Sequence, residues 1–590
     1  MATTNNFPIK DRLVWITDKK TGVKYQERRQ CQYDPKSKFN RTIKSERTGL
    51  KMLPGSDEPV LCRPKRKPGE AARAAEATAA GQTQASRTRT GASDIVSWAS
   101  KISGLRDVVR STFPAGVADK ILSIAMFMVM TGDAVHNIES WQLEHDLPYE
   151  EGLSGDSCYE LFEELGLDES GMQELFRRLA GLAGPGTPVL AFDSTTMSTY
   201  SEDGLVPTAR PGYNKAGDGL DAFKVISFFS IDTRLPVSFE IQPGNIPDVK
   251  SLLNAVKRVQ TYDLQRPEVV LDNGFFSREN VTGFCRERLK FTIRATLTDK
   301  WIYQQLDEKD EGESTIRSRF SRIKTVCPFD ATIHGGSVMK MTDLTWQRKR
   351  KTGDKAVGQE ESKQFRLYCH YFINKNKAEN KRTAFNNRIS LIKQRIEQNV
   401  GLAKEEEELA AKFLIVRNTR GGLKVDFNDD ACEEEVKDYG IFVLLSNVHS
   451  DPWVALRHYR QRNIIEQSYR TAKTELDGTR PRVWHIKNVR GKELCRMIAL
   501  GLRFVLQDAL DRVNEEASAR SKDESLAKLD RDRYLQLHRW VRDMTLQQML
   551  AWFDCVETVS VRNKHGKYRW STESTLRDKL FLELLYATQD

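Results

Sequence analysis

Two stretches that end in or near an aspartate decide the fold of this chain: GTPVLAFDSTTMST at residues 186–199 and PEVVLDNGF at residues 267–275. In each, a short apolar run stops at a carboxylate, Asp193 in the first and Asp272 in the second. Such runs are typical of buried strands in an α/β sheet, whose carboxyl ends form the rim where ligands bind. Two aspartates there could share a cation, whereas a lone one is more often a turn residue or a helix N-cap.

The segments around these stretches alternate between strand and helix patterns. A two-stranded hairpin is predicted first, followed by a helix, the strand of Asp272, another helix and another strand; these neighbouring segments are residues 221–242, 249–263, 277–289 and 290–296. Strands that alternate with helices after an initial hairpin indicate a mixed α/β sheet. The pattern is lost over residues 300–440, which we interpret as an inserted domain, and GIFVLLSN at 440–447 returns to the sheet.

The net charge of +10 comes from the N-terminal part of the chain. Before residue 95 there are 20 basic and 10 acidic residues, and the rest of the chain is neutral. Lysine and arginine that displace counterions from phosphate give affinity without sequence preference. The charge therefore favours a polyanion partner slightly over its alternative, a solubilising tail.

Composition divides the remaining chain into further segments. Short β-type runs and turn residues predict a small β-rich module at 1–60, and an Ala-, Gly- and Arg-rich composition predicts a flexible basic linker at 61–94. Apolar residues spaced by three and four predict a helical domain at 95–184, either a DNA-binding domain or a bundle packed on an enzyme. Residues 516–590 are predicted to be mainly helical, with a hairpin near VSVRNKHGKYRW.

Length and cysteine usage limit the class of protein. A chain of 590 residues is long enough for several domains with large cores. Its nine cysteines are scattered singly without a CxxC pair, which argues against a cysteine-based zinc site and a secreted disulfide framework. There is no apolar run near the ~20 residues of a membrane-spanning helix, and the first residues lack the apolar core of a signal peptide. We expect a cytoplasmic protein.

The helix predicted over YRQRNIIEQSYRTAKTEL, residues 459–476, carries an ordered face. At about 100° per residue, its marked positions fall within an arc of roughly 60° beside an apolar stripe; these positions are Tyr459, Arg462, Glu466 and Lys473. A surface helix with an i,i+4 ion pair would explain Arg462 and Glu466 alone. The ordered face therefore indicates that one edge is buried while the other presents a carboxylate and two cations.

These motifs resemble, in order, those of the insertion-sequence-four superfamily of DDE transposases, over about residues 185 to 510. The spacing of Tyr459, Arg462, Glu466 and Lys473 is similar to its YREK signature, FDSTT and LDNGF are similar to its two aspartate motifs, and PGNIPD is similar to a small element between them. DYGIFVLLSN before the helix and RPRVWHIKNVRGKELCRMIALGLRF after it also look like the large-protein branch of that group.

The resemblance implies an α/β fold with an RNase H-like core, a mixed five-stranded sheet with flanking helices that a β-rich insertion interrupts. The core would comprise residues 185–299 and 441–515, with the insertion at 300–440. Asp193, Asp272 and Glu466 would be the catalytic triad and the ligands of two Mg²⁺ ions, which Mn²⁺ would replace. Tyr459, Arg462 and Lys473 would contact DNA, with the two cations gripping phosphates.

The resemblance also implies a DNA transposase that binds terminal inverted repeats of a mobile element, pairs them as a homodimer and joins the 3′ ends to target DNA, on the nucleoid of a prokaryotic cytoplasm. The alternatives are a DDE-derived nuclease or domesticated DNA-binding protein, and a glycoside hydrolase with paired carboxylates. The hydrolase would leave the basic N-terminus unexplained. For some members the resemblance suggests a flipped base held by an aromatic residue, for which Trp301 and Trp346 are candidates; His458, beside Tyr459, is expected to be packed rather than catalytic.

Overall fold

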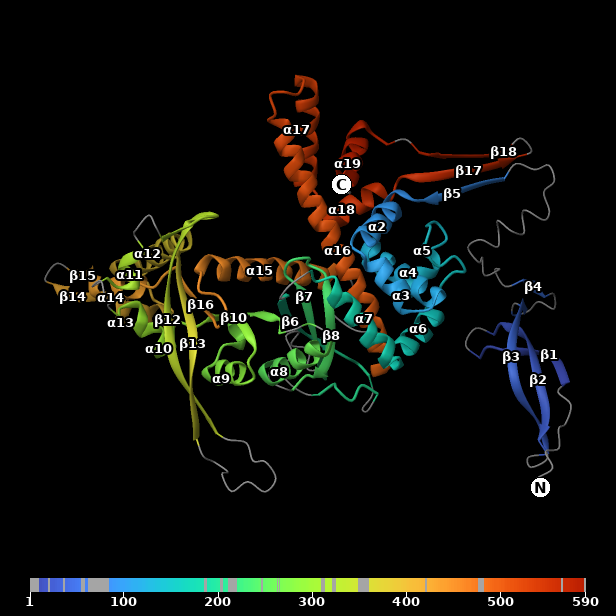
Figure 1. Ribbon diagram of the computed structural model, residues 1–590, viewed down its shortest axis with the longest axis horizontal. Coiled ribbons are helices and arrows are strands. Elements are labelled where there is room, and N and C mark those ends of the chain that lie inside the picture. Colours follow the sequence, from blue (N-terminus) through green and yellow to red (C-terminus); the bar gives the residue numbers. More distant parts are fainter. Residues whose placement is uncertain are drawn as a thin grey trace. The chain divides into compact units, whose positions relative to one another are not determined.

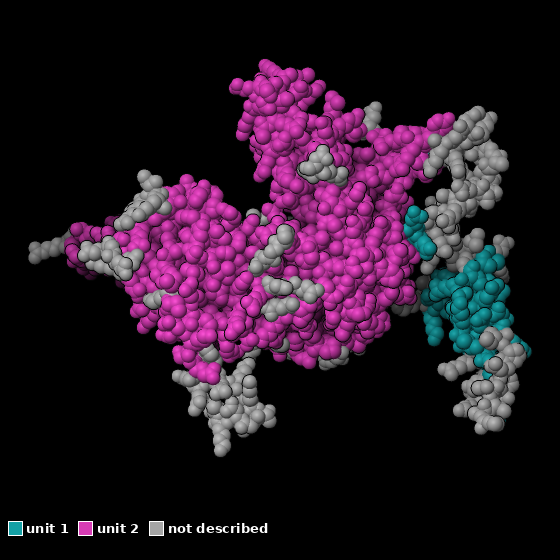
Figure 2. All heavy atoms as spheres, in the orientation of Figure 1, with its two compact units in different colours: residues 1–84, 150–152, 561–567 teal, residues 85–149, 153–560, 568–590 magenta. Residues whose placement is uncertain are grey.

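The structure is a computed structural model in which the chain divides into two compact units (Figure 2). The smaller unit comprises residues 1–84, 150–152 and 561–567, and the larger unit comprises the remainder. The residues that the structure describes are 10–19, 22–34, 38–52, 54, 59–61, 84–184, 188–201, 205–210, 220–245, 248–262, 264, 266–308, 314–320, 325–347, 360–419, 422–475, 482–563, 566–572 and 574–587.

The described residues 10–61 of the smaller unit form one four-stranded sheet in the order β1-β2-β3-β4. Its strands are antiparallel: β1 (Lys10–Thr17), β2 (Lys24–Asp34), β3 (Phe39–Met52) and β4 (Val60–Leu61). Cys31 is the one apolar side chain buried among the described residues of this sheet. The predicted β-rich module is therefore confirmed, and its side chains lie mostly at the surface.

The last part of the segment predicted to be a flexible linker, 61–94, has regular secondary structure. Residues 62–83 lie outside the described residues, but residues 84–89 form strand β5 (Gln84–Arg89), and helix α2 begins at Gly91. β5 joins a sheet with β17 and β18, where the exposed Arg87 pairs with Glu557. Pairing with a distant strand explains why a sequence with almost nothing to bury is ordered here.

The predicted helical domain is present and begins a few residues early. Its helices are α2 (Gly91–Ile102), α3 (Leu105–Thr112), α4 (Ala115–Thr131), α5 (Ile138–Trp141), α6 (Gly155–Leu167) and α7 (Glu169–Gly181). Among the described residues no single helix is long and apolar enough to cross a membrane, although α4 passes that test when combined with Val135–Trp141, to which it is bent by 103°. The middle of α4 is buried in the main apolar core.

Among the described residues, nine strands form one mixed sheet in the order β11-β12-β13-β16-β10-β9-β6-β7-β8 (Figure 1). They are β6 (Val189–Ser198), β7 (Ala222–Ser230), β8 (Pro236–Pro243), β9 (Glu268–Leu271), β10 (Lys290–Ala295), β11 (Val326–Cys327), β12 (Asp330–Gln347), β13 (Glu360–Asn374) and β16 (Ile441–Ser446). β6, β9 and β10 are parallel to one another, and the other neighbouring pairs are antiparallel.

Five of these strands, β6 to β10, carry the two motif aspartates. Their order across the sheet is β8-β7-β6-β9-β10, which is 3-2-1-4-5 when the five strands are numbered along the chain. The second of them, β7, is antiparallel to both of its neighbours. Helices α8 (Asp248–Val259) and α9 (Arg278–Arg286) connect β8 to β9 and β9 to β10. The predicted mixed α/β fold is confirmed, and the arrangement is consistent with an RNase H-like core.

The segment between β10 and β16 differs from the separate β-rich insertion expected at 300–440. β12 and β13 form a long hairpin, and β13 pairs with β16 from Tyr368 to Ile373, so these strands continue the sheet of the core. This happens because β16 uses one edge for β10 and leaves the other for β13. The short helices α10 (Lys300–Tyr303) and α11 (Ile316–Arg319) precede the hairpin.

The rest of that segment packs around a small apolar cluster of its own. Its elements are α12 (Lys375–Glu397), α13 (Lys404–Phe413), β14 (Leu414–Thr419), β15 (Gly422–Phe427) and α14 (Asp429–Val436). The buried residues of the cluster are Ile389, Ile392, Ala410, Phe413, Leu414 and Val425. The inserted part is therefore a small mixed subdomain next to a sheet extension.

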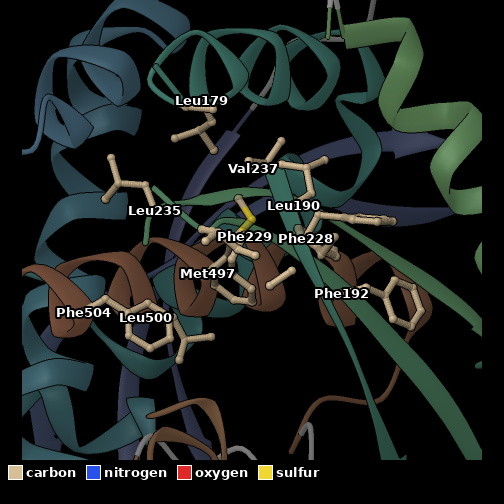
Figure 3. Packing of buried hydrophobic residues seen from close by; sticks show 14 of the residues in the cluster. Leu179, Leu190, Phe192, Phe228, Phe229, Leu235, Val237, Met497, Leu500 and Phe504 are labelled. Atoms are coloured by element: carbon tan, nitrogen blue, oxygen red, sulfur yellow. The ribbon is translucent and has the colours of Figure 1, made fainter. Parts of the chain in front are cut away.

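Two long helices follow β16. α15 (Pro452–Glu475) contacts β6, β9, β10 and β16, and α16 (Ile486–Ser521) packs on β8 and on the helical domain. The ring of Phe229 on β7 meets that of Phe504 on α16 edge-on at 5.4 Å, and Figure 3 shows Leu179 of α7 and Leu235 in the same apolar cluster. α16 thus connects the nine-stranded mixed sheet to the helical domain formed by α2 to α7.

The C-terminal region is mainly helical, as predicted. Its elements are α17 (Lys528–Arg542), α18 (Leu546–Phe553), β17 (Glu557–Asn563), β18 (Gly566–Ser571) and α19 (Leu576–Tyr586). β17 and β18 are adjacent strands at the place where the sequence predicts a hairpin.

The crossing of α6 and α16 depends on two glycines. A Cβ atom added to Gly491 would lie 2.1 Å from the carbonyl oxygen of Phe162, and one added to Gly166 would lie 1.8 Å from that of Lys487. We predict that Gly491→Ala destabilises the protein by about 1–3 kcal/mol, because overpacking a rigid helix crossing forces the backbones apart. Urea unfolding measures this.

Gly181→Ala is the control, because nothing lies within 4 Å of a Cβ added at the exposed end of α7. If the two variants unfold at the same urea concentration, α6 and α16 do not approach each other as closely at Gly491 as described.

Candidate active site

The two aspartates lie on neighbouring parallel strands, Asp272 just after the end of β9 and Asp193 within β6, which continues to Ser198 rather than ending at the aspartate as the sequence predicts. β6 pairs with β9 so that Ala191 is opposite Val270. Asp193 and Asp272 each follow their member of this pair by two residues, so they stand at the same level of strands that lie about 4.8 Å apart. The side chain of Asp193 is not among those the structure describes; its backbone pairs with Ser227 of β7.

The carboxylate of Asp272 faces helix α15. Asp272 precedes a short 3₁₀ helix (Asn273–Phe275) but makes no capping hydrogen bond with its side chain. Instead its Oδ1 accepts a hydrogen bond of 3.2 Å from the hydroxyl of Tyr459. The side chain is 40% exposed. The alternative of a helix N-cap therefore does not describe Asp272.

Arg462 lies between the carboxylates of Asp272 and Glu466. Its Nη1 donates a hydrogen bond of 2.8 Å to Oε2 of Glu466 and lies 3.9 Å from Oδ1 of Asp272. The Arg462 side chain is only 4% exposed, whereas that of Glu466 is 27% exposed. A buried guanidinium needs such partners, since burying an unpaired charge costs several kcal/mol.

The sequence predicts that Arg462 and Glu466 project from α15 together, but the structure buries Arg462 and leaves Glu466 partly exposed. Tyr459 and Arg462 are buried against the rim of the sheet rather than projecting outward, because Asp272 supplies the partner that both need. Burial and the negative charge of Asp272 raise the pKa of Tyr459, so the phenol stays protonated as a donor. The side chain of Lys473 lies outside the described part of the helix, as does that of Trp346 on β12; Trp301 packs against the main core.

The site has the composition of a divalent metal centre for hard cations. Asp272 and Glu466 both retain exposed carboxylate surface, and Arg462 holds them on one side. Asp193 stands beside Asp272 on the adjacent strand. Carboxylate oxygens with room for water are what Mg²⁺ requires, so the residues present fit such an ion.

A cleft of about 830 Å³ lies beside this site, between α15 and the helices α12 to α14. Tyr459 lines it, so the cleft reaches the residue that contacts Asp272. Its basic lining residues are Arg294, Lys377, Lys381, Lys412 and Arg460, and its acidic ones are Glu434, Glu435 and Asp438.

Sequence reasoning missed one cluster of ionisable side chains near the site. Glu268 opens strand β9 and is buried, with His449 and His458 against its carboxylate. A glutamate at the start of a buried strand needs a partner for its charge, so its presence in the apolar run EVVL could have predicted a nearby ionisable side chain. His458 was expected to be packed; it lies against Glu268 and is partly exposed.

Comparisons with known proteins place the core in a family. Residues 184–483 match the family described as "Transposase DDE domain". A solved piggyBac transposase synaptic complex with hairpin DNA is similar to this chain with 12% identity and a TM-score of 0.30, over 79% of this chain and 82% of that chain. There is no match among curated proteins.

The position of Arg462 predicts an effect on metal binding. We expect Arg462→Met to strengthen Mn²⁺ binding about fivefold, because removing a cation next to two carboxylates removes repulsion of about 1 kcal/mol. Titration calorimetry of the full chain measures the change.

Arg460→Met is the matched control, because Arg460 precedes Arg462 by two residues and pairs with Asp330 instead. Weaker or unchanged Mn²⁺ binding by Arg462→Met would show that Arg462 does not oppose a metal ion at these carboxylates.

Proposed function

Because the chain belongs to the DDE transposase family, we propose that it is a DNA transposase that cuts at the terminal inverted repeats of a mobile element and transfers the 3′ ends to target DNA. The observation that carries the proposal is the set of contacts joining Asp272, Tyr459, Arg462 and Glu466 next to the strand that carries Asp193. An ion pair with a purely structural role would need only one carboxylate beside Arg462, whereas Asp272 and Glu466 both lie near it and both are partly exposed.

We further propose membership of the insertion-sequence-four group. The YREK spacing is supported by geometry at three of its four residues, since Tyr459 and Arg462 both reach toward Asp272, and Arg462 also binds Glu466. These contacts give a physical reason for the spacing of the first three positions along the helix. Lys473 keeps its proposed role at phosphate.

The proposed chemistry uses the three carboxylates as ligands. Asp193, Asp272 and Glu466 would hold two Mg²⁺ ions, which supply an activated hydroxyl and neutralise charge on the entering and leaving oxygens. Tyr459 fixes the rotamer of Asp272 through its hydrogen bond. Arg462 orients Glu466 and neutralises the carboxylates of the free protein, and its contact with DNA phosphate would require it to turn toward the solvent.

The proposed partner is double-stranded DNA. The N-terminal sheet exposes basic side chains on strands β1 and β3, among them Lys10, Lys44 and Arg47. Exposed lysine and arginine suit phosphate contacts, which position a protein without reading sequence. Pairing of two transposon ends would require two copies of the chain, so we propose a homodimer on DNA.

Replacing one carboxylate tests the catalytic assignment. Glu466→Gln is expected to reduce Mg²⁺-dependent cleavage of repeat-end DNA by about a thousandfold or more, because a ligand charge is lost from the transition state, with DNA binding nearly unchanged. Gel assays of cleavage and of strand joining measure both steps.

Glu515→Gln, at an exposed position of α16, is the control and should retain both activities. Cleavage by Glu466→Gln at the wild-type rate would refute the triad. If the wild-type protein cleaves DNA but does not join the 3′ ends to target DNA, the protein is a nuclease.

Deleting residues 1–83 tests the N-terminal unit. This boundary keeps β5, which pairs with β17. We expect at least tenfold weaker binding to repeat-end DNA in 100 mM salt and a shallower dependence of affinity on salt, since basic contacts to phosphate are lost. Fluorescence anisotropy at several salt concentrations measures it, and equal affinity and salt slope would contradict a DNA-binding role.

A further inference from the structure

A second constellation of metal-ligand side chains lies on the same sheet, four residues before Asp272. Glu268 is the first residue of β9, His449 lies between β16 and α15, and His458 lies on α15 one residue before Tyr459. Two neighbouring histidines therefore meet a carboxylate that is far from both of them in the sequence. The Glu268 side chain is only 2% exposed, whereas His449 and His458 are 18% and 17% exposed.

The donor atoms of these residues converge. Nε2 of His449 lies 2.7 Å from Oε2 of Glu268, and Nδ1 of His458 lies 3.3 Å from the same oxygen. One donor atom from each residue lies within 4.8 Å of the other two. Ligands bound at ~2.0–2.2 Å to one ion are about 3–4 Å apart, so small side-chain shifts would admit an ion.

The nitrogen of His458 has no other use that the structure shows. Nδ1 of His458 is buried, and its 3.3 Å contact with Oε2 of Glu268 lies outside hydrogen-bond geometry. An unsatisfied buried polar atom costs about 1–3 kcal/mol. Its direction toward Glu268 and His449 makes a shared ligand the simplest way to satisfy it.

Surrounding hydrogen bonds hold the other two residues in place. Thr292 donates a hydrogen bond of 2.6 Å to Oε1 of Glu268, which leaves Oε2 for a ligand. The backbone of His449 is fixed at both ends, because its N–H donates to Ser446 Oγ at 3.1 Å and its carbonyl accepts from His370 Nε2 at 3.0 Å. Such outer contacts are typical of metal ligands.

We propose that Glu268, His449 and His458 bind one transition-metal ion of the zinc class. Two imidazole nitrogens and one carboxylate oxygen form a ligand set that zinc uses and that Mg²⁺ disfavours, so this site would be chemically distinct from the carboxylates of the active site. It uses no cysteine, which is why the cysteine spacing gave no sign of it. A water would complete the coordination on the partly exposed side of the histidines.

Ion binding would exchange protons for metal. Coordination uses the lone pair of His449 Nε2, so the proton on that nitrogen would move to Nδ1 in the neutral imidazole, or leave to solvent from the imidazolium, and the nitrogen lone pairs and the carboxylate would then coordinate the ion.

The consequence for the protein would be mechanical. The ion would connect β9 to α15 directly before Asp272 and Tyr459, and so fix the position of the helix against the strand. The proposal concerns binding in the absence of DNA and does not depend on the proposed transposition.

The test uses the purified full chain, stripped with chelator and dialysed. We expect it to bind one equivalent of Zn²⁺ by mass spectrometry of the metal, and to give visible absorption bands with Co²⁺ from nitrogen and oxygen coordination. Glu466→Gln should behave like the wild type, which separates this site from the catalytic carboxylates. His458→Ala and Glu268→Gln should lose at least tenfold in Zn²⁺ affinity.

His136→Ala, at an exposed position of the helical domain, is the matched histidine control and should bind normally. Glu268→Gln keeps the shape of the side chain and so guards against misfolding, which circular dichroism checks. The proposal is overturned if the wild type retains no Zn²⁺, or if Zn²⁺ affinity and the Co²⁺ bands are the same in folded His458→Ala or Glu268→Gln as in the wild type.

Discussion

The parallel pairing of β6 with β9 is the constraint on which the rest of the site depends. It sets Asp193 and Asp272 at one level of adjacent strands, just past Ala191 and Val270, the last residues that β6 and β9 pair. A shift by one residue would turn one of the two side chains to the opposite face of the sheet. The apolar residues of both strands, which are buried on either face, hold that register.

Helix α15 adds the third carboxylate through a buried cation rather than through an exposed one. Arg462 and Tyr459 both pack on the rim and both address Asp272, which places Glu466 one turn further along the helix. The helix is held from the other side where His458 meets Glu268. The geometry of the candidate site is therefore maintained from β9 at two points, Glu268 and Asp272.

Much of this arrangement could be predicted from sequence because its signals are local. Apolar runs ending at Asp193 and Asp272 marked the central strands, and helical spacing correctly grouped Tyr459, Arg462 and Glu466. The direction of Arg462 could not be predicted, because it depends on a carboxylate nearly 200 positions away. For the same reason the pairing of β13 with β16, the strand at 84–89 and the cluster at Glu268 were missed: each is stabilised by a partner distant in sequence.

The central claim is that Asp193, Asp272 and Glu466 bind metal together. A crystal structure of the full chain soaked in Mn²⁺, with an anomalous difference map, tests it most directly. We expect Mn²⁺ peaks within about 2.5 Å of carboxylate oxygens of Asp193, Asp272 and Glu466. Mn²⁺ bound elsewhere while these carboxylates stay paired only with Arg462 and Tyr459 would contradict it.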